Sequence, residues 1–210
     1  MWLRRPIECV LFDIGGVVIH ADFEPVFKVA SMMFGCSQDV LAAHIPELIE
    51  DLERGLIDTY SLWDQLGKTL AKQGLGQRQD PEKCTHLWSK MMEDTLRVDE
   101  PMMDLCRRLG VRLPVGALSN TISEHANYLQ RQGVYELFNP CILSFETGTR
   151  KPERSIYLQA AELMNTRPQN CLFIDDRKEN IVGAKAVKMQ THHFTDQAAL
   201  EQCLKGFGLL

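Results

Sequence analysis

The sequence predicts an α/β protein, a parallel sheet with helices on both faces and a block of helices inserted after the first strand. Two observations predict this fold class. From about residue 101 onward, short apolar runs alternate with helical patterns, which is typical of parallel sheets with crossover helices. Residues from about 20 to 95 are instead helical throughout, enough for a four-helix bundle. A length of 210 residues fits a core with a small appendage.

The first expected element is a buried strand over residues 7–12, an apolar run rich in strand formers. It ends at Asp13, and glycines at 15 and 16 permit a sharp turn before a short extended piece over 17–19. The helical block begins directly afterwards. We therefore expect a core made of residues 1–18 and 96–210, and a helical cap made of residues 19–95.

Four helices are expected in the cap. Asp22 and Ser37 are placed to cap the first two, and Pro46 is expected to break the second. Patterns over residues 59–73 and 81–92 predict the third and fourth. Apolar residues at helical spacings are expected mainly to pack inside this bundle: Phe23, Phe27, Met32, Met33, Trp63, Met91 and Met92.

The rest of the chain alternates strands and helices. Strands are expected over residues 114–118, 141–143, 171–174 and 191–194. Helices are expected over residues 101–109, 123–132, 152–165 and 181–187, and at the C-terminal end.

Polar residues gather where these strands end. Ligands of open parallel sheets bind at the carboxyl ends of the strands, so we expect three carboxylates, one ammonium and one hydroxyl at a single edge. Hard oxygen ligands suit Mg²⁺, which keeps waters and substrate oxygens in its shell. The sequence thus predicts a site for Mg²⁺ and a phosphate. In chain order its residues are Asp13, Ser119, Asn120, Lys151, Asp175 and Asp176.

Composition narrows the partners. The chain has 23 basic and 28 acidic residues, a net charge of −5, and no basic stripe, so we expect no nucleic-acid partner. Seven cysteines without a C-x-x-C spacing indicate free thiols. No run has the length and apolarity of a signal peptide or a membrane span. We expect a cytoplasmic enzyme, a monomer or homodimer, that acts on a small phosphorylated substrate.

Four motifs resemble those of the haloacid dehalogenase-like (HAD) superfamily, which consists mostly of phosphatases. They stand in order, each at an expected strand end, and read VLFDIGGVV, GALSN, GTRKPE and LFIDDRKEN. The residues of these motifs resemble those of the subgroup that holds bacterial α-glucose-1-phosphatase and the N-terminal phosphatase domain of soluble epoxide hydrolase. The resemblance implies a Rossmann-like core with strand order 5-4-1-2-3 and a helical cap inserted after the first motif.

The resemblance also implies catalytic and substrate-binding residues. Asp13 would be the nucleophile that forms an aspartyl-phosphate, and Lys151 would neutralise both the phosphate and the nucleophile. The Ser119 hydroxyl and the Asn120 amide would hold the phosphoryl oxygens.

The metal site is implied in the same way. Mg²⁺ would be held by the Asp13 carboxylate, the backbone carbonyl of Gly15 and Asp176. Asp175 would be a further ligand or a partner through water, and Asn180 would orient the acidic pair.

One position departs from most phosphatases of this superfamily, which carry a second aspartate two residues after the nucleophile. That aspartate protonates the leaving group and then activates water, a contribution of ~10²–10⁴-fold. Gly15 stands there in this chain, as in the glucose-1-phosphatase relatives. His20, Asp22 or a water are hypotheses for its replacement.

The motifs favour a Mg²⁺-dependent phosphatase of a small metabolite such as a sugar phosphate. One alternative is a metal-independent 2-haloacid dehalogenase, whose first motif also lacks the second aspartate. Such enzymes usually place non-carboxylate residues where Asp176 stands, which argues against it. A second alternative is a catalytically weak phosphate-binding regulatory module, suggested by Gly15.

Overall fold

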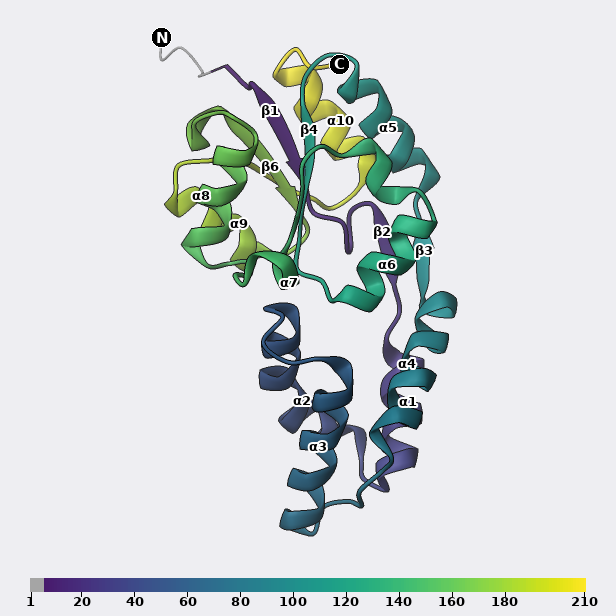
Figure 1. The fold of residues 1–210 in the computed structure, drawn as a ribbon. Coiled ribbons are helices and arrows are strands. Elements are labelled where there is room, and N and C mark those ends of the chain that lie inside the picture. Colours follow the sequence, from purple (N-terminus) through teal and green to yellow (C-terminus); the bar gives the residue numbers. More distant parts are fainter. Residues whose placement is uncertain (1–5) are drawn as a thin grey trace.

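The structure, a computed structural model, describes residues 6–210 and contains a five-stranded parallel sheet in the order β5-β4-β1-β6-β7 (Figure 1). When the five core strands are numbered along the chain, this order is 3-2-1-4-5, which is 5-4-1-2-3 counted from the other edge of the sheet. The predicted α/β fold and strand order are therefore confirmed. The expected core begins at residue 1, and its first five residues lie outside the described residues. The strands are β1 (Cys9–Phe12), β4 (Val115–Ser119), β5 (Cys141–Leu143), β6 (Cys171–Asp175) and β7 (Gln190–His193).

Helices cover both faces of the sheet. Val10 and Phe12 of β1 pack against α5 (Glu100–Gly110), α6 (Ser123–Arg131) and α10 (Gln197–Gly206). On the other face, Cys9 and Leu11 pack against α8 (Arg154–Leu163) and α9 (Lys178–Ala186). Because all four residues of β1 are buried, this strand belongs at the centre of the sheet.

The cap consists of four helices and lies at one end of the core (Figure 1). The chain enters it through β2 (Ile19–Ala21) and leaves through β3 (Leu96–Val98), which pair as an antiparallel ribbon. Three-residue strands carry no recognisable period, so the sequence did not predict β3. The helices are α1 (Glu24–Phe34), α2 (Gln38–Glu53), α3 (Thr59–Gln73) and α4 (Pro81–Thr95).

Two expectations for the cap are wrong. Pro46 does not break the second helix, since α2 continues to Glu53. The hydrogen bond that the proline removes is compensated by burial of Ile45 and Leu52 in the cap core on either side of it. Met32 is not a core residue but 73% exposed.

The helix N-termini largely follow the sequence signals. Ser37 caps α2 by accepting a hydrogen bond from the Val40 amide. Asp22 accepts one from the Glu24 amide, although the helical bounds of α1 make Phe23 the capping position.

Several short elements escape sequence patterns. They are the helical turns η1 (Val134–Leu137), α7 (Ser144–Thr147) and η2 (Pro168–Asn170). All seven cysteines lie in the described part of the chain and are free thiols. Among residues 6–210, none of the helices combines the length and apolarity needed to cross a membrane.

Candidate active site

Asp13 is fixed at the carboxyl end of the central strand. Its backbone amide donates to the Ile174 carbonyl of β6 at 2.8 Å, and its Oδ1 accepts from the Ile14 amide at 2.7 Å. The residue is 6% exposed. A carboxylate held this firmly by its own backbone is preoriented for chemistry at the sheet edge.

Lys151 brings a buried positive charge to the same point. Its Nζ lies 2.7 Å from Asp13 Oδ1 and 2.8 Å from Asp175 Oδ2, and the residue is 1% exposed. The ring of Phe173 lies below the ammonium, 5.5 Å from Nζ to its centroid. One ammonium thus contacts two of the carboxyl groups of the site.

The Asn120 side chain positions Lys151. Its Oδ1 accepts from the Lys151 amide at 2.8 Å, and its Nδ2 donates to the Lys151 carbonyl at 2.9 Å. This pairing engages the Asn120 side chain, and the role of an Asn120 amide in holding phosphate stays a prediction. The backbone N–H of Asn120, beside the buried Ser119 at the end of β4, is the candidate donor for that role.

Asp175 and Asp176 follow β6, and their neighbours orient them differently. Asp175 is fully buried and accepts from Asn180 Nδ2 at 3.0 Å and from the Arg177 amide at 2.8 Å, so the orienting partner expected at Asn180 is present. Asp176 is exposed and lies against Gly16, where φ is +78° and a Cβ would meet Asp176 Oδ2 at 2.3 Å. Only glycine lets the first turn approach this carboxylate.

The three carboxylates form a group that fits a hard cation. Oxygens of Asp13, Asp175 and Asp176 lie within 4.8 Å of one another, and oxygen ligands are those that Mg²⁺ takes. Burial and the neighbouring Asp175 charge raise the pKa of Asp13 to about 8, against the opposing effect of Lys151. Burial and Asp175 also raise the pKa of Asp176. A divalent cation among these groups would relieve the repulsion.

A cavity of about 220 Å³ adjoins this site, between the cap and the core. Gly15, Ser119 and Asn120 line it on the side of the site. Phe23 and Phe27, expected mainly to pack in the bundle, line it from the cap. Sequence patterns could not distinguish packing in the cap core from lining the cavity, because an aromatic residue on one helix face has the same spacing in both cases.

The geometry argues against His20 as the missing proton donor. Ile19 and Ala21 of β2 line the cavity, and His20 between them points to the opposite face. There its Nε2 contacts Asp99 Oδ2 at 3.1 Å. Asp22 is exposed and bonded to the Glu24 amide.

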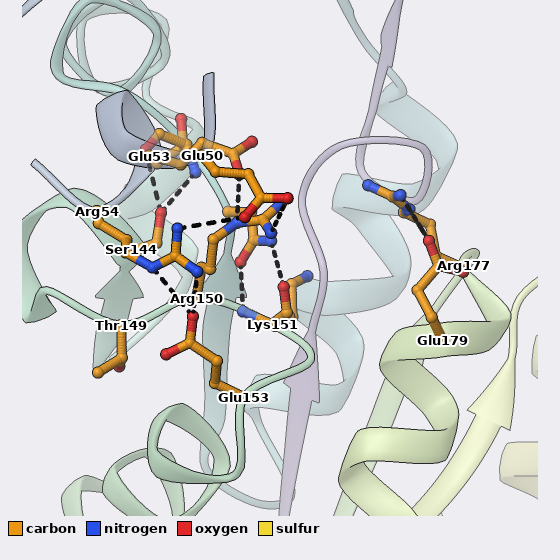
Figure 2. Close-up of polar contacts among 12 residues, drawn as sticks. Glu50, Glu53, Arg54, Ser144, Thr149, Arg150, Lys151, Glu153, Arg177 and Glu179 are labelled. Atoms are coloured by element: carbon orange, nitrogen blue, oxygen red, sulfur yellow. Dashed lines mark hydrogen bonds and ion pairs between the residues drawn. The ribbon is translucent and has the colours of Figure 1, made fainter. Parts of the chain in front are cut away.

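The cap and core are joined by charged groups that sequence reasoning missed. Figure 2 shows this clasp, in which the end of α2 meets the segment before α8. Arg150 Nε donates to Glu53 Oε2 at 2.8 Å, and Arg54 Nη2 lies 2.8 Å from Glu153 Oε1. Because Arg150 precedes Lys151, the clasp ties the cap to the loop that carries the buried ammonium.

Comparison with known proteins agrees with this geometry. The model of the haloacid dehalogenase-like hydrolase family matches residues 7–188. The chain is 26% identical over 196 residues, 91% of its length and 92% of the relative's, to the sesquiterpene phosphatase astK of Aspergillus oryzae.

Two solved structures share the fold. A HAD family enzyme of Bacteroides thetaiotaomicron, in complex with magnesium and inorganic phosphate, superposes with a TM-score of 0.74 at 23% identity, over 92% of this chain and 98% of that one. An L-2-haloacid dehalogenase of Xanthobacter autotrophicus superposes with a TM-score of 0.60 at 19% identity, over 97% and 84%. The fold is thus shared by an enzyme that binds magnesium and phosphate and by a dehalogenase.

The α/β core, with three carboxylates and a buried lysine at one edge of its sheet, is the arrangement of a hydrolase. The chain belongs to the haloacid dehalogenase-like hydrolase family. The predicted superfamily and the prediction of an enzyme are confirmed.

Proposed function

We propose that the chain is a Mg²⁺-dependent phosphomonoesterase that works through an aspartyl-phosphate. The observation that carries the proposal is the position of Lys151 Nζ, 2.7 Å from Asp13 Oδ1 beside a group of three carboxylates. A carboxylate is a poor nucleophile toward an anionic phosphate unless nearby positive charge masks it. The sesquiterpene phosphatase astK, which this chain matches over 92% of that protein's length, supports the same reaction.

In the proposed reaction an Asp13 oxygen attacks phosphorus, the bond from phosphorus to the alcohol oxygen breaks, and that oxygen takes its proton from water. Water then hydrolyses the acyl phosphate and regenerates the Asp13 carboxylate. Lys151 orients the nucleophile and offsets the developing charge. The Ser119 hydroxyl and the Asn120 backbone amide hold the phosphoryl oxygens. Mg²⁺ bound by Asp13, the Gly15 carbonyl and Asp176 would supply Lewis-acid neutralisation of the phosphate, with Asp175 beside it.

The residues of the first motif further support assigning the chain to the subgroup of α-glucose-1-phosphatase and the N-terminal phosphatase domain of soluble epoxide hydrolase. In this motif Gly15 occupies the position of the usual second aspartate. The dehalogenase alternative is disfavoured, since Asp176 contributes a carboxylate to the acidic group. Division of the chain into core residues 1–18 and 96–210 and cap residues 19–95 is part of the same proposal.

Phosphate release from p-nitrophenyl phosphate tests the reaction. We expect release with Mg²⁺, none in chelator, and recovery when Mg²⁺ is restored. Asp13→Asn should abolish turnover while the far-ultraviolet circular dichroism is kept. Asp104→Asn, at an exposed position on α5, is the matched control and should keep full activity.

Other outcomes identify the alternatives. Chloride release from 2-chloropropionate in chelator, without phosphate release, would favour the dehalogenase. Tight phosphate binding without turnover under saturating Mg²⁺ would favour the regulatory module.

A further inference from the structure

The cavity beside the site has a composition that bears on the substrate. Gly15, two residues after the proposed nucleophile, and Ser119, at the end of the neighbouring strand β4, line one part of it, and Trp88 of α4 and His125 and Leu129 of α6 line another. Ten of its sixteen lining residues carry apolar side chains. Whatever alcohol is attached to a phosphate at Asp13 has this cavity as the adjoining space.

An aromatic wall built from both the cap and the core lines the cavity. It consists of Phe23, Trp88 and His125, and the His125 ring stacks with Phe23 at 5.8 Å and with Trp88 at 6.0 Å between centroids. Trp88 Nε1 and His125 Nε2 are buried and have no hydrogen-bond partner among residues 6–210. The rings therefore present carbon to the cavity, although two of them carry polar atoms.

Charge is also scarce along this surface. Burial lowers the pKa of His125 to about 4, so the ring is neutral at pH 7. The Glu53 carboxylate is paired with Arg150 in the clasp, and the Asn120 side chain is paired with the Lys151 backbone. A sugar has several hydroxyls to satisfy, and beside the Ser119 and Thr121 hydroxyls few polar side chains of the lining are left to replace their water.

We propose, on the basis of the phosphomonoesterase function above, that the substrate is the monophosphate of an apolar aliphatic alcohol whose hydrocarbon chain fills this cavity. The sugar phosphate suggested by the sequence would bring several hydroxyls to a lining of mainly apolar side chains. At roughly 30 Å³ per water-sized group, the cavity accommodates about seven methylene-sized groups.

A series of primary alkyl phosphates from ethyl to decyl tests this directly, with p-nitrophenyl phosphate and glucose 1-phosphate in parallel. Transfer of a methylene from water to an apolar site gains about fourfold in binding. We expect kcat/KM to rise by about that factor per carbon up to about seven carbons and then to level off. Glucose 1-phosphate should be a poorer substrate than hexyl phosphate.

Variants on one helix separate the cavity from the cap surface. Phe27→Ser opens the wall of the cavity and should lower the octyl-to-ethyl ratio of kcat/KM by about tenfold. Met32→Ser, exposed on the same helix, should leave that ratio unchanged. As a readout independent of turnover, 1-octanol should raise the Tm of the wild-type protein more than that of Phe27→Ser.

The outcomes distinguish the two proposals. Turnover of p-nitrophenyl phosphate and glucose 1-phosphate with no dependence on alkyl chain length would overturn the apolar substrate and leave the phosphomonoesterase intact. No turnover of any phosphate under saturating Mg²⁺ would overturn the phosphomonoesterase. In that case a Tm increase with 1-octanol that Phe27→Ser loses would still identify the cavity as an apolar binding site.

Discussion

Gly15→Asp should supply the proton donor that this chain lacks, and the structure sets what the substitution costs. A Cβ built on Gly15 meets no heavy atom within 4 Å, and the backbone there is not in the left-handed region. The Cβ of the new side chain therefore meets no steric obstacle. Replacing a glycine at a compatible position restricts the unfolded chain and contributes ~0.4–1 kcal/mol of stability, which opposes the repulsion between the new carboxylate and those of Asp13 and Asp176. A loss of activity from misfolding is not expected.

The expected gain depends on the leaving group. General acid catalysis contributes ~10²–10⁴-fold, and we expect about 10²-fold for alkyl phosphates, since no neighbour was selected to orient the new carboxylate. That factor corresponds to about 2.7 kcal/mol of barrier. Aryl phosphates with acidic leaving groups need little protonation and should change far less.

The assay is a series of substituted phenyl phosphates that differ mainly in leaving-group pKa. In the wild-type enzyme, log kcat/KM should fall steeply as that pKa rises, and in Gly15→Asp the slope should flatten. Gly15→Asn fills the same space without an acidic proton, so it should keep the steep slope. A flat dependence in the wild type, with chemistry shown to be rate-limiting, would refute the reasoning, because another residue would then supply the proton.

Three further predictions follow from the site and the clasp. Lys151→Ala should lower kcat by about 10²–10³-fold, as loss of one electrostatic donor does, and a near-wild-type rate would contradict the proposed role of the ammonium. Burial raises the pKa of Asp13 to about 8 from the ordinary 3.8, so the folded chain holds an extra proton between those pH values. The Tm in chelator should therefore fall as pH rises from 4 to 8, and Asp13→Asn should lose part of that slope. Arg54→Met removes the pair with Glu153 and should raise KM by severalfold at most, whereas Arg107→Met, a surface position on α5, should not.

The local patterns of the sequence were sufficient to predict the parallel sheet and the residues that gather at its edge. Apolar runs mark buried strands whatever surrounds them, and parallel strands bring their carboxyl ends to one edge. For this reason Asp13, Lys151 and Asp175 could be expected together before any coordinates. Gly16 could likewise be expected in a turn, although its contact with Asp176 could not.

Tertiary structure alone decided how the side chains are used. The Asn120 side chain pairs with the Lys151 backbone, because two loops from different strands meet there. Pro46 lies inside a helix because burial in the cap outweighs the lost hydrogen bond. The cavity between Trp88 and the core depends on how the cap docks, a long-range packing that no window of sequence records. The end of a strand can be predicted from the local sequence, whereas the cavity between cap and core exists only once both have folded and packed together.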